Sequence, residues 1–212
     1  MYRKQGLITV HRKVYVPRND NVSAQAIQMI PPDPAATTIT FDGNPDTIVT
    51  HQGTEVYDEF GSRSCTVVLK GDNRAHLVDE EGNDIQALTT ITVRASEFTN
   101  PGSMPAILPP TSGYTYCAEL SGDGIQRVRF EKPVITWVNN FLGFDVGQTV
   151  PVGYYDRDRG VWVPSDNGVV VKLLDRDHNG IVDALDADGN DQPDDLNGDG
   201  SFSDEVSGLS DP

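Results

Sequence analysis

Basic residues are scarce in this chain of 212 residues. It has 16 lysines and arginines against 32 aspartates and glutamates, and its net charge at pH 7 is −16. Binding to nucleic acid needs clusters of positive charge that neutralise phosphates. No basic stripe of this kind occurs in the sequence, so we do not expect nucleic acid as a partner.

Long hydrophobic runs are also absent. A membrane-spanning helix needs about 20 consecutive apolar residues, and no run in the sequence approaches that length. The first residues, Met1–Gly6, lack the apolar region of a signal peptide. We therefore expect no membrane span, and either a cytoplasmic protein or a piece of a longer secreted one.

Cysteine is limited to Cys65 and Cys117. Both lie in β-like runs, and only one internal pairing is available to them. A disulfide and a pair of buried thiols are both compatible with this pattern.

Helical periodicity is missing, because no segment keeps a period of 3.6 residues over three turns. Short runs rich in Val, Ile, Thr, Tyr and Phe recur instead between turn signals, which predicts an all-β fold of one or two antiparallel β-sandwiches. The predicted strands are Leu7–Val10, Val14–Val16, Thr37–Phe41, Cys65–Leu69, Leu88–Val93, Tyr114–Ala118, Ile125–Phe130 and Val134–Val138.

Prolines divide the chain. The cluster at Ile30–Ala36 cannot lie in a central strand and predicts a linker. The expected units are trailing strands of a preceding domain (1–30), a first β-sandwich (31–100), a second sandwich or the completion of the first (101–174), and a segment of acidic loops (175–212).

The acidic segment follows the ligand order of an EF-hand-type calcium loop. From Asp175, oxygen-bearing side chains stand at loop positions 1, 3 and 5, glycine at 6, and carboxylates at 9 and 12. Calcium takes about six to eight oxygen ligands, and the glycine allows the sharp turn that brings them together. The predicted ligands of this first loop are Asp175, Asp177, Asn179, the backbone carbonyl of Ile181, Asp183 and Asp186.

Two further loops follow with shared ends: the second begins at Asp186, where the first ends, and the third begins at Asp195, within the second. Asp191 replaces the glycine of the second loop, and position 12 of the third falls on Val206, so Asp204 or Glu205 is its substitute ligand. The second-loop ligands are Asp186, Asp188, Asn190, Asp194 and Asn197. The third-loop ligands are Asp195, Asn197, Asp199 and Ser201. We predict Ca²⁺ as the cofactor, and a disordered acidic tail is the alternative.

Charge is concentrated in the same segment. Residues 175–212 carry twelve acidic and one basic residue, which leaves a net charge of only −5 for residues 1–174. Without cations such crowding repels itself and extends the chain, so metal binding is expected to couple to folding. Because calcium is abundant outside cells, the loops favour an extracellular or cell-surface location.

Catalytic motifs are missing, including HExxH, G-x-S-x-G and the P-loop. Two of Asp156, Asp158 and Asp166 could form the carboxylate pair that glycoside hydrolysis requires. We expect instead that they belong to a solvent-exposed turn. Trp137 and Trp162 could form a sugar-stacking platform, although buried aromatics are the commoner case in sandwiches. We expect no enzyme.

Five blocks of the body resemble the region upstream of the repeats in bacterial RHS (YD-repeat) proteins. They are Leu88–Thr99, Met104–Tyr116, Val128–Val134, Val138–Phe144 and Val150–Gly168, and the last is the most specific. The likeness covers residues 60–210. Their order is also similar to the β-sandwich of ankyrins and netrin receptors and its partner sandwich. The resemblance implies a module of a large secreted or surface protein, whose neighbours would be a YD-repeat shell of the same polypeptide.

The acidic segment resembles thrombospondin type 3 repeats and, at Asp195–Gly200, dockerin loops. A strand-like run, Gly168–Leu174, precedes Asp175 where an EF-hand has a helix. We therefore expect a non-catalytic structural module with a calcium-stiffened linker. The alternatives are an adhesion or carbohydrate-binding module that contacts a cell-surface glycan or protein, and a glycoside hydrolase accessory domain.

Overall fold

The computed structural model describes residues 1–19, 21–23, 26–196, 198, 200–203 and 206. Strands β1 to β17 follow one another along the chain, and the described residues contain no helix. The predicted all-β class is therefore confirmed. The described part of the chain has no helix with the length and apolar character that crossing a membrane requires.

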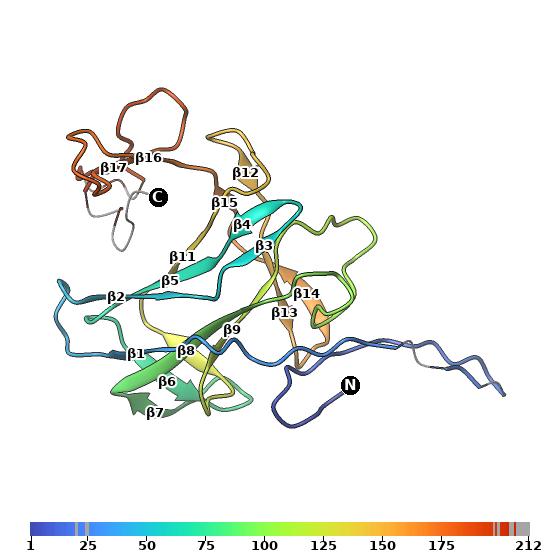
Figure 1. Ribbon diagram of the computed structural model, residues 1–212. Coiled ribbons are helices and arrows are strands. Elements are labelled where there is room, and N and C mark those ends of the chain that lie inside the picture. Colours follow the sequence, from blue (N-terminus) through green and yellow to red (C-terminus); the bar gives the residue numbers. More distant parts are fainter. Residues whose placement is uncertain (20, 24–25, 197, 199, 204–205, 207–212) are drawn as a thin grey trace.

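Two three-stranded antiparallel sheets pack face to face and form the centre of the molecule (Figure 1). The central strands β5 and β8 each pair on both sides. The first sheet consists of β1 (Thr37–Thr40), β8 (Thr90–Glu97) and β9 (Ala118–Gly122). The second consists of β2 (Ile48–Gln52), β5 (Cys65–Lys70) and β11 (Ile135–Val138).

Alternation along these strands places one apolar face of each sheet inside, as a period of two residues requires. The buried core comes from β1, β5 and β8 and consists of Ile39, Cys65, Val67, Leu69, Ile91, Val93 and Ala95. A third sheet borders this core, with Val128 and Phe130 packed against it. That sheet contains β10 (Val128–Phe130), β6 (Ala75–Val78) and β7 (Asp84–Leu88).

Strands from beyond residue 100 complete the sheets of the first half of the chain. β9 pairs with β8, β10 with β6 and β11 with β5, so residues 37–138 share one set of sheets. Four two-stranded pairs lie around them. They are β3 (Val56–Asp58) with β4 (Gly61–Arg63), β12 (Thr149–Val150) with β15 (Gly168–Val169), β13 (Gly153–Asp156) with β14 (Val161–Pro164), and β16 (Lys172–Leu174) with β17 (Ala184–Asp186).

Three predicted strands are not formed. Residues 7–10 have a single bridge between Tyr2 and Val10, residues 14–16 belong to no strand, and of residues 114–118 only Ala118 enters one. Ile8 packs with Phe98 and Met104 in a second small core instead. β-Propensity expresses fit to a neighbouring strand, so an apolar run that lacks such a neighbour forms no ladder. Tyr114 and Cys117 also pack against the second core, whereas Val14–Val16 stay exposed.

The proline segment is held against the body by a buried aspartate. Asp33 is 9% exposed, and its backbone N–H donates to Oγ of Ser96 (2.8 Å). Its carboxylate accepts from the hydroxyl (2.6 Å) and the N–H (2.8 Å) of Thr54 and from the N–H of Ala35 (2.7 Å). Burial alone would raise the pKa of Asp33, but these donors outweigh it and hold the pKa below its ordinary value.

A buried ion pair crosses the sandwich edge. Arg63 and Glu97 are 3% and 5% exposed in their side chains and lie 2.7 Å apart, and Arg63 also binds Asp58 (2.8 Å). The guanidinium lies 4.5 Å from the ring centroid of Phe141. Because a buried charge without a partner is costly, these partners fix one arrangement of β4 against β8.

The two cysteines form no disulfide. Cys65 lies in the main core, whereas Cys117 packs against the second core. Burial raises the pKa of the Cys65 thiol to about 11 and that of Cys117 to about 12, so both thiols are protonated at neutral pH. Of the two alternatives, the structure therefore has free thiols, with Cys65 buried and Cys117 half-buried.

We predict that Leu69→Ala lowers the free energy of unfolding by about 2–5 kcal/mol, because it leaves a cavity in the sandwich core. Leu69 is 1% exposed, whereas Leu120 is 50% exposed and provides the matched control. Leu120→Ala should cost about 1 kcal/mol or less. Urea denaturation measures both, and equal losses would contradict the assignment of the core.

We also predict a pH-dependent effect of Asp33→Asn. The folded-state pKa of Asp33 lies below the unfolded one, so its contribution is present above the unfolded pKa and is lost as pH falls through the folded value. At neutral pH the variant should be less stable by about 1–3 kcal/mol. The gap to wild type should shrink below about pH 4. Exposed Asp46→Asn is the control, and a gap independent of pH would refute the prediction.

Candidate metal centre

The acidic segment begins on a two-stranded hairpin. β16 and β17 pair through Leu174 and Ala184, and the N–H of Asp183 donates to the carbonyl of Leu174 (2.7 Å). Leu185 is fully buried, and Val182 is 3% exposed. A strand therefore precedes the first loop, as its sequence predicted, and apolar side chains hold the loop's end in place.

The first loop gathers three of its predicted ligands. One carboxylate oxygen from each of Asp175, Asp177 and Asp183 lies within 4.8 Å of the others. The N–H of Gly180 donates to Oδ2 of Asp175 (2.9 Å), and that of Asn179 donates to Oδ1 (3.2 Å). Gly180 has a φ of 82°, a conformation that favours glycine.

The second loop repeats this geometry eleven residues later. Asp186, Asp188 and Asp194 bring one oxygen each within 4.8 Å. The N–H of Asp191 donates to Oδ2 of Asp186 at 2.9 Å, as Gly180 does to Asp175. Asp191 occupies the glycine position with a φ of 63°, so the loop keeps its shape at the expense of local backbone strain.

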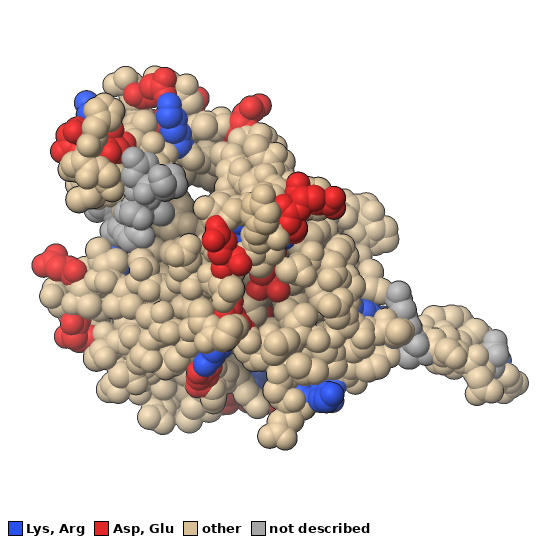
Figure 2. All heavy atoms as spheres, in the orientation of Figure 1, with Lys and Arg blue, Asp and Glu red and all other residues tan. Residues whose placement is uncertain are grey.

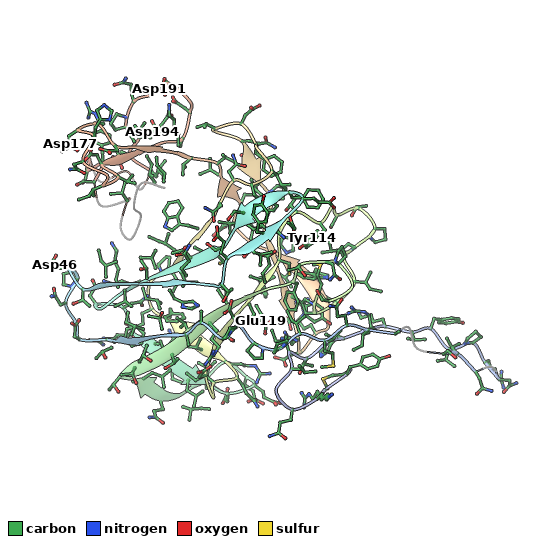
Figure 3. All side chains as sticks on the ribbon, viewed as in Figure 1. Asp46, Tyr114, Glu119, Asp177, Asp191 and Asp194 are labelled. Atoms are coloured by element: carbon green, nitrogen blue, oxygen red, sulfur yellow. The ribbon has the colours of Figure 1, made fainter. Side chains whose placement is uncertain are left out.

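The remaining carboxylates of the two loops also correspond. Asp183 accepts from the N–H of Arg176, and Asp194 accepts from the N–H of Ala187, both at 2.7 Å. Figure 3 shows Asp177, Asp191 and Asp194 on neighbouring loops at one end of the molecule. The repeat is therefore structural as well as sequential.

The third loop is described in part. Asn197 and Asp199, both predicted ligands, and the substitutes Asp204 and Glu205 lie outside the described residues. Gly198 and Gly200 donate to Asp195 at 2.6 and 2.8 Å, as Gly189 and Asp191 do to Asp186 in the second loop. Ser201 lies within the described residues but in neither carboxylate group.

The side-chain oxygens of two predicted asparagine ligands accept hydrogen bonds within their own loops. Oδ1 of Asn179 accepts from the N–H of Ile181, and Oδ1 of Asn190 accepts from the N–H of Gln192, both at 2.7 Å. Asp186 was assigned to both loops, and it groups with the second, where Asp188, Gly189 and Asp191 donate to it. Its role as the last ligand of the first loop stays a prediction.

Backbone donors lower the pKa of the first carboxylate of the first loop and of the second loop. Hydrogen bonds from Gly180 and Asn179 lower the pKa of Asp175. Burial alone would raise the pKa of Asp186, which is fully buried, but the N–H groups of Asp191 and Gly189 outweigh it and lower the pKa. Figure 2 shows acidic side chains gathered on these projecting loops. The local charge balance therefore favours a cation.

The donor set fits calcium. Oxygens that bind one Ca²⁺ at about 2.3–2.6 Å lie at most about 4.6–5.2 Å apart. In both carboxylate groups the oxygens lie within 4.8 Å of one another, which is compatible with this span. All the candidate ligands are hard oxygen donors, which suit Ca²⁺ rather than softer transition metals.

Gly147, which belongs to none of the predicted loops, lies where the second loop meets the body. Gly147 has a φ of 83°, and a Cβ placed on it would lie 2.9 Å from the carbonyl oxygen of Ala187. Its N–H donates to the carbonyl of Val170 (2.8 Å). A contact between two backbone segments that are distant in the chain leaves no pattern in the sequence. The residues Asp145–Gln148 predict only that the chain turns at this point.

Three of the other candidate residues, Asp156, Asp158 and Trp162, make structural contacts. Oδ1 of Asp156 accepts from the N–H groups of Asp158 and Arg159 in the β13–β14 turn, and Asp158 pairs with Arg127. Nε1 of Trp162 donates to the carbonyl of Ile107 (3.0 Å), and its ring packs on Tyr155 with centroids 5.3 Å apart. These contacts are typical of a turn and of a packed aromatic cluster.

No family model matches the sequence, and the searches of curated proteins and of solved structures found no match. The function is therefore argued from the geometry of the site.

We predict that Gly147→Ala detaches the calcium-type loops from the body. Gly143→Ala is the matched control, because Gly143 has a φ of 68° but no atom within 4 Å of an added Cβ. Both variants should lose about 1–3 kcal/mol through backbone strain. Only Gly147→Ala should also raise the rate of trypsin cleavage at Arg176. Equal cleavage rates in the two variants would show that the contact with Ala187 has no role.

Proposed function

We propose that this chain is a non-catalytic structural module of a large secreted or surface protein of the RHS/YD-repeat type, and that its acidic segment is a calcium-stiffened linker. The observation that carries the calcium part is the repeated loop geometry. Two triplets of carboxylates, spaced by eleven residues, are held by the same backbone donors at the same positions.

Electrostatics links calcium to stiffness. Three carboxylates within 4.8 Å repel one another strongly unless a cation lies between them. The ion-free segment should therefore open readily, whereas the ion-bound loops form a chain in which Asp186 ends one loop and begins the next. The free energy of calcium binding then contributes directly to the free energy of folding of the segment.

The described contacts support a brace rather than a calcium sensor. A sensor uses the movement of helices to expose an apolar groove, whereas here strands flank the first loop and the second loop touches the body at Gly147. The module would join neighbouring domains of the same polypeptide outside the cell, where calcium at the affinity of extracellular loops is available. Translation of the reading frame beyond Pro212 tests the family part, because YD repeats should follow.

Calorimetric titration tests calcium binding. We expect heat with a Kd of about 10⁻⁴–10⁻³ M, the class of extracellular modules. Asp177→Asn and Asp188→Asn change position 3 of the first and second loops, so each should weaken one site and spare the other. Asp46→Asn, an exposed carboxylate outside the segment, is the control and should leave the titration unchanged.

Proteolysis gives an independent measure. Arg176 is the single basic residue of residues 175–212 and lies inside the first loop, so trypsin reports directly on that loop. Calcium should slow cleavage there, and a chelator should restore it. Absence of heat together with an unchanged cleavage rate would refute the proposed calcium function.

A further inference from the structure

An extended arm leaves the body near the N-terminus. Its base is fixed on one side by Arg12, whose guanidinium donates to the carbonyls of Gly102 (2.8 Å) and Met104 (3.2 Å), and on the other by Gln28, which accepts from Asn100 (3.3 Å). Figure 1 shows the intervening chain running outward and back. The described residues between these anchors, 13–19, 21–23 and 26–27, belong to no strand.

The arm exposes apolar side chains that the rest of the molecule does not cover. Val14, Tyr15 and Val16 are 41%, 84% and 57% exposed. They are β-branched or aromatic residues in succession, the types that fit a pleated sheet. An extended apolar segment with no ladder of its own is the form in which a strand is added to the edge of another sheet.

The arm also differs from the rest of the chain in charge. Residues 1–30 hold five basic residues and one acidic residue, whereas the remainder holds 11 basic and 31 acidic residues. Lys13 and Arg18 flank the apolar triplet and are exposed. An acidic edge strand with an apolar neighbour would therefore complement the arm.

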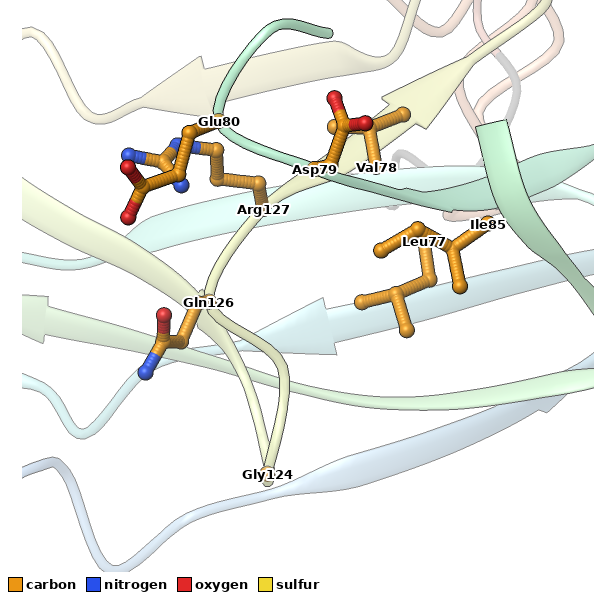
Figure 4. Close-up of a pocket in the computed structure, with 8 residues that line it drawn as sticks. All are labelled: Leu77, Val78, Asp79, Glu80, Ile85, Gly124, Gln126 and Arg127. Carbon is orange, nitrogen blue, oxygen red and sulfur yellow. The ribbon is translucent and has the colours of Figure 1, made fainter. Parts of the chain in front are cut away.

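The strand β7 provides such an edge. β6 pairs with it on one side, and no strand of the described residues pairs with it on the other. Ile85 of β7 is 60% exposed. It borders a shallow hollow of about 370 Å³ with Leu77 on its floor and Asp79, Glu80 and Arg127 along its rim (Figure 4). Arg127 is paired with Asp158, so acidic groups remain in excess on this rim. Exposed apolar edges of this kind invite pairing with another chain.

We infer that the arm of one copy of this chain pairs with β7 of a second copy, with Val14–Val16 against Ile85 and the hollow, and Lys13 and Arg18 facing its acidic rim. The arm and β7 lie on opposite sides of the molecule in Figure 1, so a molecule cannot fill its own edge. The contact is heterologous and leads from one copy to the next, as a linear or ring assembly. It involves none of the calcium ligands.

Sedimentation velocity over a range of concentrations tests this pairing in calcium-free buffer and in calcium. We expect reversible association in both, weaker at high salt because the charges are exposed. Tyr15→Asp should weaken association about tenfold or more, since it places a carboxylate in an apolar contact. Ile85→Lys should do the same from the acceptor side.

Two controls separate the contact from general surface effects. Tyr57 is 83% exposed on β3, so Tyr57→Asp makes the same change at the same exposure elsewhere. Ile48 is 42% exposed on β2, another edge strand, and Ile48→Lys tests whether β7 is the edge used. A monomer at every concentration, or equal weakening by the controls, would overturn the pairing. Association that requires calcium would assign the contact to the acidic loops instead.

Discussion

The face-to-face burial of β5 against β8 is the constraint on which the rest of this structure depends. Both strands pair on two sides, and their inward residues supply six of the seven members of the main core. Strands from the second half of the chain complete both sheets, so neither half can bury its apolar face alone. Burial of apolar area, the main favourable term in folding, is thus available only when residues 37–138 assemble together.

Buried polar groups then select one arrangement of these sheets. The ring of His51 accepts from the N–H of Ala95 (3.1 Å), which links β2 of one sheet to β8 of the other. Arg63 and Glu97 link β4 to β8, and Asp33 fastens the proline segment beside them. Apolar packing tolerates small shifts, whereas buried donors and acceptors do not. A buried polar group without a partner costs its full desolvation free energy, because no hydrogen bond replaces those it made with water.

The acidic segment follows a different physical rule. It has a small apolar anchor around Val182 and Leu185, and otherwise backbone N–H groups turned toward carboxylates. A segment of this charge gains little from hydrophobic burial, and we propose that its order depends on cations and on its contact with the body at Gly147. The arm near the N-terminus is basic, and its apolar side chains Val14, Tyr15 and Val16 are exposed. The two ends of the described chain therefore differ in charge and in exposed apolar surface.

The sequence by itself determined the all-β class and the loop positions of the carboxylates, because both depend on short-range spacing: alternation within a strand, and oxygens at fixed offsets from a turn. It predicted the strands that contain Ile39, Val67 and Val93, which the structure confirms. It predicted strands at Val14–Val16 and Tyr114–Ala118 that did not form, since a strand needs a neighbour and pairing is set by contacts distant in the chain. Only the tertiary structure decided that Asp191 adopts the glycine conformation, that Cys65 and Cys117 stay apart, and that Gly147 meets Ala187. The Asp191 conformation follows from the hydrogen bond that closes its loop onto Asp186. The positions of the two cysteines and the Gly147 contact depend on segments distant in the chain, which local spacing does not encode.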